Sequence, residues 1–515
     1  MQKLESNVVL SPTDLANHLA CKHLSWLNYH SLYGGARPSK NDDELTEILQ
    51  QYGAEHEATY FAALSEQLAA VNRTIVNLDI DRDMDAPYSV AALRDRAALT
   101  AQSLSDGPNA LYQPTFFSED GGIAWVGRAD FLVPTDVASL LGNYSFEPED
   151  TKLARIAKVN AVLQLCSYAE QLTKLQGTEP EFIHVVTGSA KEGKVTIRLS
   201  EVSAYFRHVK KNLQQAVIDK FEGPSEPVPV ENCNMCRWNK DCAQWWRERD
   251  HLSYVAGLLN GHRETLVSHG ITTLAQLATS PDDLSVPEFE DETLHRLRRQ
   301  AQLQYNTRVA KQANPAALPE TEFILPIKDF RGFNMLPTPN AGDLFYDIEG
   351  HPYRGDEGLE YLHGFSWKEA DGTLKYHEIW AHTPEEERQA LLDVIAFINK
   401  RRSIPGFEEM RVYHFGHYEP SALRRLSTRY ATAETELNSL IRQRVFCDLS
   451  RVVTQAMRIG VESYSIKKLE QLYVFNRTDL VADGGLSIVY YEKWLQSINN
   501  GGFGPEGDTA VLREL

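Results

Sequence analysis

The stretch "FEPEDTKLARIAKVNAVLQLCSYAEQL", residues 146–172, places a carboxylate and an amine on alternate residues, Asp150 and Lys152. The residues up to Lys152 have the pattern of a β-strand, in which alternate side chains project from the same face. The residues that follow have the pattern of a helix, on which Gln164 and Tyr168 share a face because they are four positions apart. The stretch therefore predicts a strand and a helix that present a carboxylate, an amine and two hydrogen-bonding groups.

A second carboxylate lies upstream in the run "GRADFL", where we expect Asp130 in a strand of the hairpin predicted over residues 110–134. If that strand neighbours the one that carries Asp150, both carboxylates converge on one divalent cation, and oxygen ligands suit Mg²⁺ or Mn²⁺. Lys152 would face the same cleft, where an amine can orient water and stabilise negative charge. The alternative is an ordinary surface position for each residue, because Asp-x-Lys is a common tripeptide.

The order of an Asp in a strand, a later Asp-x-Lys in a strand, and a helix with Gln-x-x-x-Tyr resembles the active site of the RecB-type PD-(D/E)XK nucleases. The resemblance implies a restriction-endonuclease-like α/β domain over residues 1–250 that hydrolyses DNA with bound Mg²⁺ or Mn²⁺. It implies that the two aspartates bind the metal, the lysine activates water, and the glutamine and tyrosine hold substrate phosphates. The five catalytic residues are then Asp130, Asp150, Lys152, Gln164 and Tyr168.

The same resemblance implies a histidine from an early helix as an additional metal ligand. The run "YGAEHEATYF" lies in a helix predicted over residues 43–72 and supplies His56. The alternative is a surface histidine beside acidic residues.

Six cysteines are present, and three of them follow closely on one another in "ENCNMCRWNKDCAQWW", at Cys233, Cys236 and Cys242. A fourth, Cys21, lies far upstream in "LACKHLSWL". No secretory signal is evident, so clustered cysteines indicate metal ligands rather than disulfides. Sets of four thiolates hold zinc or iron–sulfur clusters.

This division of the ligands, with one early and three late, resembles the iron–sulfur-stapled RecB-type nucleases. The resemblance implies a 4Fe–4S cluster that joins the two ends of the nuclease domain, and a Zn²⁺ site is the alternative. Such a cross-link closes a loop of over ~200 residues and so restricts the unfolded chain. We expect the remaining two cysteines, Cys166 and Cys447, to be small core residues.

A second pair of carboxylates, Asp347 and Glu349 in "LFYDIEGHP", occupies one face of another predicted strand. The pair resembles the first motif of the DEDD 3′–5′ exonucleases, a branch of the RNase H fold in which four acids hold two metal ions. The resemblance implies Glu419 as the next acid and places the last acid beyond Leu515, whereas we expect Asp448 to cap a helix. Two interpretations follow: a longer chain supplies the last acid, or the domain is a scaffold.

A chain of 515 residues has room for roughly two to four domains. Residues 251–312 are expected to form a small helical domain, either similar to a helix-hairpin-helix or a plain helical connection. Residues 313–340 are expected to be a linker, and residues 341–515 a truncated RNase H-like α/β domain. This layout resembles a bacterial family of RecB-like nucleases in which a helicase motor follows, and no phosphate-binding loop of a motor occurs here.

The formal net charge of −19 argues against broad, non-specific nucleic-acid binding. Local clusters of Lys and Arg are either solvated helix faces or patches that touch phosphates. No membrane span is expected, and we expect a cytoplasmic protein. The sequence therefore predicts a nuclease for single-stranded or end-bearing DNA, with two alternatives: a DNA-binding assembly module for a helicase motor, and an RNA-directed nuclease that uses the RNase H-like domain.

Overall fold

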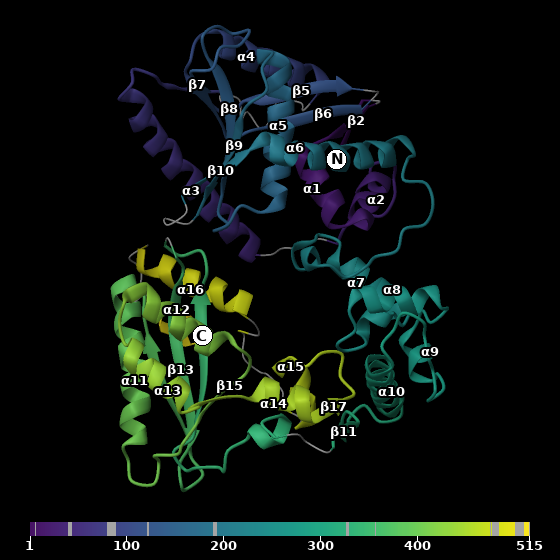
Figure 1. Ribbon diagram of the computed structural model, residues 1–515, viewed down its shortest axis with the longest axis vertical. Helices are drawn as coiled ribbons and strands as arrows, with labels where there is room; N and C mark the ends of the chain where they lie inside the picture. The colour runs from purple at the N-terminus through teal and green to yellow at the C-terminus, as the bar shows by residue number, and fades with distance from the viewer. Residues whose placement is uncertain are drawn as a thin grey trace. The chain divides into compact units, whose positions relative to one another are not determined.

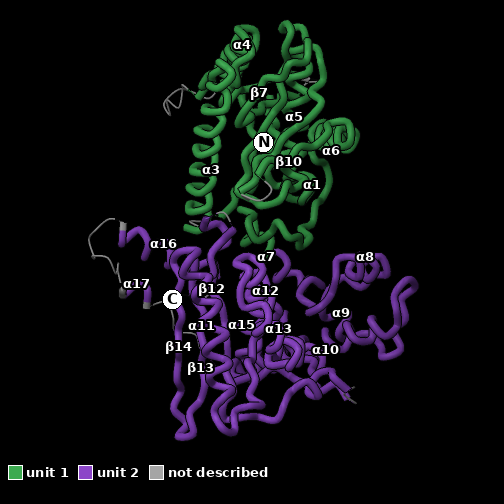
Figure 2. The backbone as a smooth tube through the Cα atoms, turned by 60° about the vertical axis from the view of Figure 1, so that its left-hand side comes forward, with its two compact units in different colours: residues 1–243 green, residues 244–515 purple. Residues whose placement is uncertain are grey.

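A computed structural model describes most of the chain: residues 1–5, 7–39, 44–79, 89–120, 123–188, 193–325, 329–355, 357–473, 475, 481, 484–499 and 509–513. The chain forms two compact units, residues 1–243 and 244–515 (Figure 2). Both units contain helices and strands, which confirms the mixed α/β class predicted from the sequence. None of the described helices is both long and apolar enough to cross a lipid bilayer.

Two sheets form the framework of the first unit. The smaller has the order β1-β2-β6-β5, with strands Gln2–Leu4, Asn7–Leu10, Ile123–Arg128 and Thr115–Asp120. The larger has the order β10-β9-β8-β7-β4-β3, with strands Lys194–Arg198, Phe182–Thr187, Ser145–Lys152, Phe131–Thr135, Ala110–Tyr112 and Ile75–Asn77. Strand β8 pairs antiparallel with β7 and parallel with β9. The strand predicted to end at Lys152 is therefore an interior strand of the larger sheet.

Helix α5, Val159–Gln176, packs against β8 and β9 and fills the core of the first unit (Figure 1). Its N-cap, Lys158, has an extended backbone, so residues 153–158 separate the helix from the end of β8 at Lys152. Helix α3, Glu44–Ala69, also packs against β8. The other helices of the first unit are α1 Pro12–Ala20, α2 Lys22–Ser31, α4 Val90–Ser105, α6 Leu199–Ile218, the short helix η1 Glu231–Met235, and α7 Asn239–Glu248, which extends past residue 243.

The second unit begins with a small helical bundle around its own apolar core. Its helices are η2 Leu252–Tyr254, α8 Asn260–Ser268, α9 Leu274–Ala278 and α10 Asp291–Ala313. The segment predicted as a linker carries β11, Thr321–Phe323, and a short helix η3, Gly332–Met335. Strand β11 pairs antiparallel with β17, Met457–Ile459, so this segment is anchored by main-chain hydrogen bonds.

A five-stranded sheet with the order β14-β13-β12-β15-β16 dominates the second unit. The strands are Leu374–Trp380, Leu359–Lys368, Leu344–His351, Val412–His414 and Phe446–Asp448. Strand β13 pairs antiparallel with both β14 and β12, whereas β15 and β16 run parallel to β12. The carboxyl ends of β12, β15 and β16 therefore lie at one edge of the sheet.

Three helices cover one face of this sheet: α11 Pro384–Arg402, α12 Tyr418–Tyr430 and α13 Glu434–Arg442. Leu344, Tyr346 and Ile348 of β12 are buried beneath them, while Phe345 and Asp347 on the opposite face are exposed. This alternation is the one expected for a strand with one covered face. The remaining helices are α14 Leu449–Ala456, α15 Ile466–Leu469, η4 Glu470–Leu472, α16 Gly484–Asn499 and α17 Thr509–Arg513.

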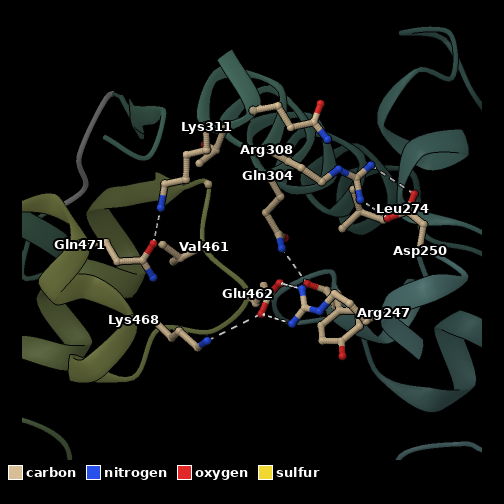
Figure 3. Close-up of a pocket in the computed structure, with 14 residues that line it drawn as sticks. Arg247, Asp250, Leu274, Gln304, Arg308, Lys311, Val461, Glu462, Lys468 and Gln471 are labelled. Carbon is tan, nitrogen blue, oxygen red and sulfur yellow. Dashed lines mark hydrogen bonds and ion pairs between the residues drawn. The ribbon is translucent and has the colours of Figure 1, made fainter. Parts of the chain in front are cut away.

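A polar pocket of about 570 Å³ lies between α10 and the chain that follows β17 (Figure 3). Its arginines face carboxylates, because Arg247 pairs with Glu462 and Arg308 pairs with Asp250. One turn away on α10, Gln300 donates to the carbonyl of Ile459 at 2.8 Å. These contacts hold the segment after β17 on the helical bundle.

Gly460 permits the close approach of that segment to α10. A Cβ atom at this position would lie 2.0 Å from Thr307 Oγ1 and 2.6 Å from the carbonyl oxygen of Leu303. We expect Gly460→Ala to destabilise the second unit by about 1–3 kcal/mol, because the backbone must move to accept the methyl group. Chemical denaturation measures the effect. The control is Gly261→Ala in α8, where an added Cβ would have no atom within 4 Å. It should stabilise the protein by up to about 1 kcal/mol, because alanine favours a helix. Equal stabilities of the two variants would contradict the tight packing at Gly460.

Candidate functional site

Asp150 and Lys152 lie together at the carboxyl end of β8. Their side chains project from the same face of the strand, as predicted, and Asp150 Oδ2 forms an ion pair with Lys152 Nζ. Asp150 is only 1% exposed. Oδ2 of Asp150 is buried and has no hydrogen-bond partner among the described residues, so the lysine is its main compensation.

Asp130 lies in a bend between β6 and β7, which corrects the prediction that it lies within a strand. The reason is that the chain leaves the smaller sheet at Arg128 and joins the larger one at Phe131, so neither ladder includes Asp130. Its Oδ2 accepts hydrogen bonds from the backbone N–H of Thr151 at 2.7 Å and from the Thr151 hydroxyl at 2.8 Å. Asp130 is thereby fixed beside Asp150, as the sequence pattern required.

The electrostatics of this group show a shortage of positive charge. Burial, and then the charge of Asp130, raise the pKa of Asp150 to about 8, although Lys152 opposes the shift. Burial lowers the pKa of Lys152, but Asp150 and Asp130 outweigh it and the net shift is upward. Two close carboxylates beside one ammonium group carry one uncompensated negative charge when both are ionised. A bound cation would compensate this charge and favour the ionised form of both acids.

The donor set of this group suits Mg²⁺ or Mn²⁺, because both prefer oxygen ligands and Mg²⁺ is commonly held by only one or two carboxylates together with substrate phosphates. Among the residues that the structure describes, no three His, Cys, Asp or Glu side chains are arranged to hold a metal ion by themselves. A metal at Asp130 and Asp150 would therefore need ligands from water or substrate.

Tyr168 and Gln164 project from α5. Burial raises the pKa of Tyr168 well above its usual value, and the charges of Asp150 and Asp130 raise it further, so the tyrosine lies near both carboxylates. Gly127 on β6 admits the ring, because a Cβ there would be 3.0 Å from Tyr168 Cε1. Gln164 is half-buried, and its amide lies 3.5 Å from the hydroxyl of Thr13.

His56 lies on α3, and its Nε2 is 3.3 Å from the carbonyl oxygen of Val186 on β9. Val186 is the pairing partner of Thr151, so the histidine lies one strand away from the end of β8. In the described part of the chain no contact joins His56 to Asp130 or Asp150. Its role as a metal ligand stays a prediction.

The four cysteines of the predicted cluster gather in one region of the first unit. Burial raises the pKa of the Cys242 thiol to about 12, and the nearby Cys236, Cys21 and Cys233 contribute to the shift. Backbone N–H groups point at three of the sulfur atoms, each at 3.4 Å: Leu24 N to Cys21, Val230 N to Cys233, and Trp238 N to Cys236. The four thiols therefore lie near one another, but no three of them are arranged to hold a metal ion in the described structure. Their role as ligands of a cluster stays a prediction.

The two ends of the first unit are also joined by contacts that the sequence did not suggest. Trp238, one of the largest fully buried side chains, donates from Nε1 to Asn28 Oδ1 at 2.9 Å. Trp26 donates to the carbonyl of Gly223 at 3.0 Å. The closeness of Trp238 to Cys236 in sequence was the available signal, because a large aromatic next to a ligand needs a partner surface. Side-chain contacts therefore join the two ends of the first unit, and closure by a bound cluster stays a prediction.

The second candidate site is a cleft of about 420 Å³ beside β12, and both Asp347 and Glu349 line it. Burial raises the pKa of Glu349, a hydrogen bond from Ser487 on α16 lowers it, and the charge of Asp347 raises it. A β-bulge follows Glu349, where the register of β12 with β13 shifts at Gly350. Bulges re-aim side chains, and this one lies directly beside the predicted acid pair.

Glu419 does not line this cleft. It is buried at the start of α12, with Oε2 at 3.4 Å from His414 Nδ1. Asp448 is the N-cap of α14, as predicted: its Oδ1 accepts from the backbone N–H of Arg451 at 3.2 Å and of Gly416 at 3.0 Å. Cys166 and Cys447 are both buried, which confirms their predicted core positions.

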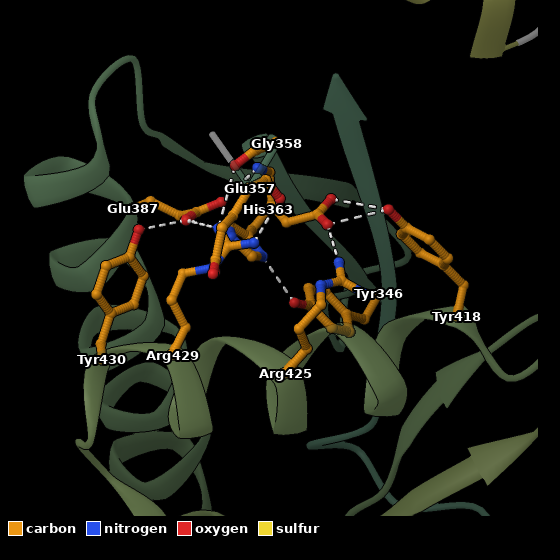
Figure 4. A network of polar contacts seen from close by, with 10 residues as sticks. Tyr346, Glu357, Gly358, His363, Glu387, Tyr418, Arg425, Arg429 and Tyr430 are labelled. Carbon is orange, nitrogen blue, oxygen red and sulfur yellow. Dashed lines mark hydrogen bonds and ion pairs between the residues drawn. The ribbon is translucent and has the colours of Figure 1, made fainter. Parts of the chain in front are cut away.

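A network of charged side chains ties β13 to helices α11 and α12 on the covered side of the sheet (Figure 4). Glu360 accepts a hydrogen bond from Tyr418 at 2.9 Å and pairs with Arg425. Glu387, which is fully buried on α11, pairs with Arg429 at 2.7 Å. The paired charges offset the cost of burying two carboxylates and fix the helices relative to the strand that neighbours Asp347.

Comparison with known proteins bears on the second unit. Residues 344–503 match the family model described as the RNase_H superfamily, and the match takes in the whole five-stranded sheet. No curated protein matches the chain. Residues 344–503 therefore form an RNase H-like domain, as the pattern around Asp347 and Glu349 predicted.

Proposed function

We propose that this protein is a metal-dependent nuclease that hydrolyses DNA phosphodiester bonds at the end of β8. The observation that carries the proposal is the convergence of Asp130, Asp150 and Lys152, in which two carboxylates share one ammonium group and the pKa of Asp150 rises to about 8. This is the arrangement that the resemblance to PD-(D/E)XK nucleases implies. Single-stranded or end-bearing DNA is the proposed substrate, and a helicase motor and a cytoplasmic location are proposed with it.

The residues have separate roles in this proposal. Asp130 and Asp150 would hold Mg²⁺ or Mn²⁺, which when bound supplies a Lewis acid for the phosphate. Lys152 keeps its charge at neutral pH, because the pKa of its amine is raised. It can therefore orient a water molecule and stabilise the charge that develops on the phosphate. Tyr168 and Gln164, on the helix that packs against β8, would position the substrate phosphate by donating hydrogen bonds.

The four cysteines would hold a 4Fe–4S cluster in this proposal, with Zn²⁺ as the alternative. Either would close the first unit around residues 21 and 233–242 and would not take part in the hydrolysis. The nearness of the four half-buried thiols supports a cluster, because burial and the neighbouring thiols raise the pKa of Cys21, Cys236 and Cys242, and a bound cation would favour the thiolate forms.

A second candidate function is favoured by the match of residues 344–503. Domains of the RNase H superfamily are typically metal-dependent nucleases, and Asp347 and Glu349 line a cleft in this domain. We propose that this cleft is a further hydrolytic centre, on DNA or RNA. Glu419 is an unsuitable third ligand as it stands, because it is buried against His414.

Cleavage of matched DNA and RNA oligonucleotides tests both functions. We expect the wild-type protein to cut single-stranded DNA with Mg²⁺ or Mn²⁺ and not with EDTA. Lys152→Ala should reduce this cleavage by about 10²–10³-fold, because it removes one stabilising charge, whereas Asp347→Asn should reduce only the activity of the second cleft. Binding without metal-dependent products would refute the hydrolytic proposal and favour an assembly module. Activity lost only in Asp347→Asn would assign the reaction to the RNase H-like domain.

A further inference from the structure

A second pocket of about 700 Å³ in the RNase H-like half is lined by an unusual number of arginines. It lies between the chain around η3, helices α12, α13 and α14, and strands β15 and β16. The lining arginines are Arg411, Arg424, Arg444 and Arg451. Asp448 is the one carboxylate in the described lining, and its Oδ1 already accepts two backbone N–H groups. Arg411 pairs with Glu409, which is outside the lining, at 3.4 Å. The other three arginines still give the pocket an excess of positive charge, in a chain whose net charge is −19.

The charges of this pocket are not balanced as those of the pocket beside α10 are. Arg247 and Arg308 in that other pocket each face a carboxylate (Figure 3). By contrast, Arg424 and Arg451 are exposed and have no ion-pair partner among the described residues. Unpaired guanidinium groups that converge on a pocket are suited to phosphate, which they can contact with two parallel hydrogen bonds.

An exposed aromatic ring adds a second kind of contact. Phe330 lines the pocket and is 70% exposed. The guanidinium of Arg444 lies over its ring, 5.2 Å from the centroid. Arginines that follow a phosphate backbone, together with an aromatic face on which a base can stack, are the pattern of single-strand binding sites.

The pocket adjoins the cleft of Asp347 and Glu349. His414, at the carboxyl end of β15, lines both cavities. Because β12, β15 and β16 are parallel, the acid pair lies at the same edge of the sheet as His414, the last residue of β15, and Arg451, which follows β16. Arg424 lies on the helix that follows β15, whereas Arg411 and Arg444 precede β15 and β16 and extend the pocket along the strands. Ligands of open α/β sheets bind outside the carboxyl ends of the strands, where the strand order reverses.

We propose that this arginine pocket binds the sugar–phosphate backbone of a single-stranded nucleic acid and leads the strand to the cleft of Asp347 and Glu349. This site extends the second function proposed above. Hydrolysis of the bound strand in the cleft of Asp347 and Glu349 depends on that proposed function. Binding itself does not depend on hydrolysis, because the arginines neutralise phosphates without a metal ion.

The test is fluorescence anisotropy of labelled single-stranded oligonucleotides, in EDTA so that nothing is cut. Arg424→Gln, Arg444→Gln and Arg451→Gln combined should weaken binding about tenfold or more at moderate salt, and the slope of log K against log salt should flatten by about 2, since roughly 0.7 counterion is released per phosphate contact. The matched control combines Arg388→Gln, Lys375→Gln and Lys400→Gln, which removes the same charge from exposed positions outside the pocket. Circular dichroism confirms that both variants fold.

Equal losses in the two triple variants would overturn the proposal, because the effect would then be one of net charge. DNA and RNA strands of the same sequence show which sugar is preferred, and preference for either is consistent with a backbone site. Modification of the wild-type protein with phenylglyoxal gives a second measurement: the oligonucleotide should protect Arg424, Arg444 and Arg451 but not Arg388, and equal protection would also refute the site. Failure of cleavage with intact binding would remove the proposed hydrolysis and keep the pocket.

Discussion

Asp150→Asn is expected to reduce metal-dependent cleavage by about 10²–10³-fold and, at the same time, to stabilise the metal-free protein. The loss of activity follows because an amide is a poor ligand for Mg²⁺ and Asp130 would remain as the only carboxylate of the pair. The gain in stability follows because the wild-type carboxyl is buried beside a second carboxylate. Residues that bind a metal or substrate often lower the stability of the protein when that ligand is absent.

The stability effect has a definite dependence on pH. The pKa of Asp150 is about 8 in the folded protein against 3.8 for the free side chain. Between about pH 4 and pH 8 the unfolded chain has lost this proton while the folded chain keeps it, so this group makes folding less favourable as the pH rises. Asp130, Lys152 and Tyr168 are the titratable groups that face it. The advantage of Asp150→Asn over the wild type should therefore grow by about 1–3 kcal/mol across this range.

Urea unfolding at several pH values in EDTA measures this advantage. Addition of Mg²⁺ should then stabilise the wild type more than the variant, because only the wild type keeps both carboxylates. Glu149→Gln is the matched control, one residue away and equally buried. Glu149 pairs with Lys194 instead, so its loss should destabilise the protein and leave cleavage within severalfold. If the difference in unfolding free energy between Asp150→Asn and the wild type did not change with pH, the destabilising effect assigned to the buried carboxylate pair would be contradicted.

If the four cysteines hold the proposed metal cluster, Cys236→Ser is expected to prevent its binding and to destabilise the first unit by about 5 kcal/mol. The magnitude is that of the entropy of closing a loop of roughly 200 residues in the unfolded chain. Iron, sulfide and zinc content of protein purified without oxygen identifies the cluster, and denaturation measures the stability. Brown protein with iron and sulfide supports the iron–sulfur cluster, whereas colourless protein with stoichiometric zinc supports the alternative.

The matched control for this variant is Cys166→Ala, which loses a buried thiol outside the cluster. It should keep its iron and lose only about 1 kcal/mol, the usual cost of a small deletion in a core. If Cys236→Ser retained wild-type iron, sulfide and stability, the four thiols would have no role as ligands. Contacts such as Trp238 to Asn28 should persist in the variant and keep part of the closure.

Local patterns in the sequence were sufficient for much of the fold. The alternation around Asp150 and Asp347 predicted the strands β8 and β12. Each of these features depends on residues a few positions apart, so the necessary information is present in a short window. The RNase H-like fold was recognisable for the same reason, because its first acids lie on one strand.

Long-range contacts could not be predicted in the same way. Asp130 was placed in a strand because its neighbours favour one, and only the pairing of β7 with a different sheet reveals the bend. Glu419 follows a strand as the expected acid would, yet it is buried against His414, a contact that depends on how α12 packs. The arginine pocket is lined by residues from six separate elements, which no local window of the sequence contains.

The glycine that follows the second acid of β12 restricts how this domain can vary. A Cβ at Gly350 would lie 2.2 Å from Glu360 Oε2, and Glu360 is held in turn by Arg425. Substitutions at positions 350, 360 and 425 should therefore occur together among descendants of this sequence. A larger residue at position 350 is tolerable only where the glutamate at position 360 has been replaced by a shorter residue. Natural variants of the sequence should then show correlated residue types at these three positions, next to the acid pair.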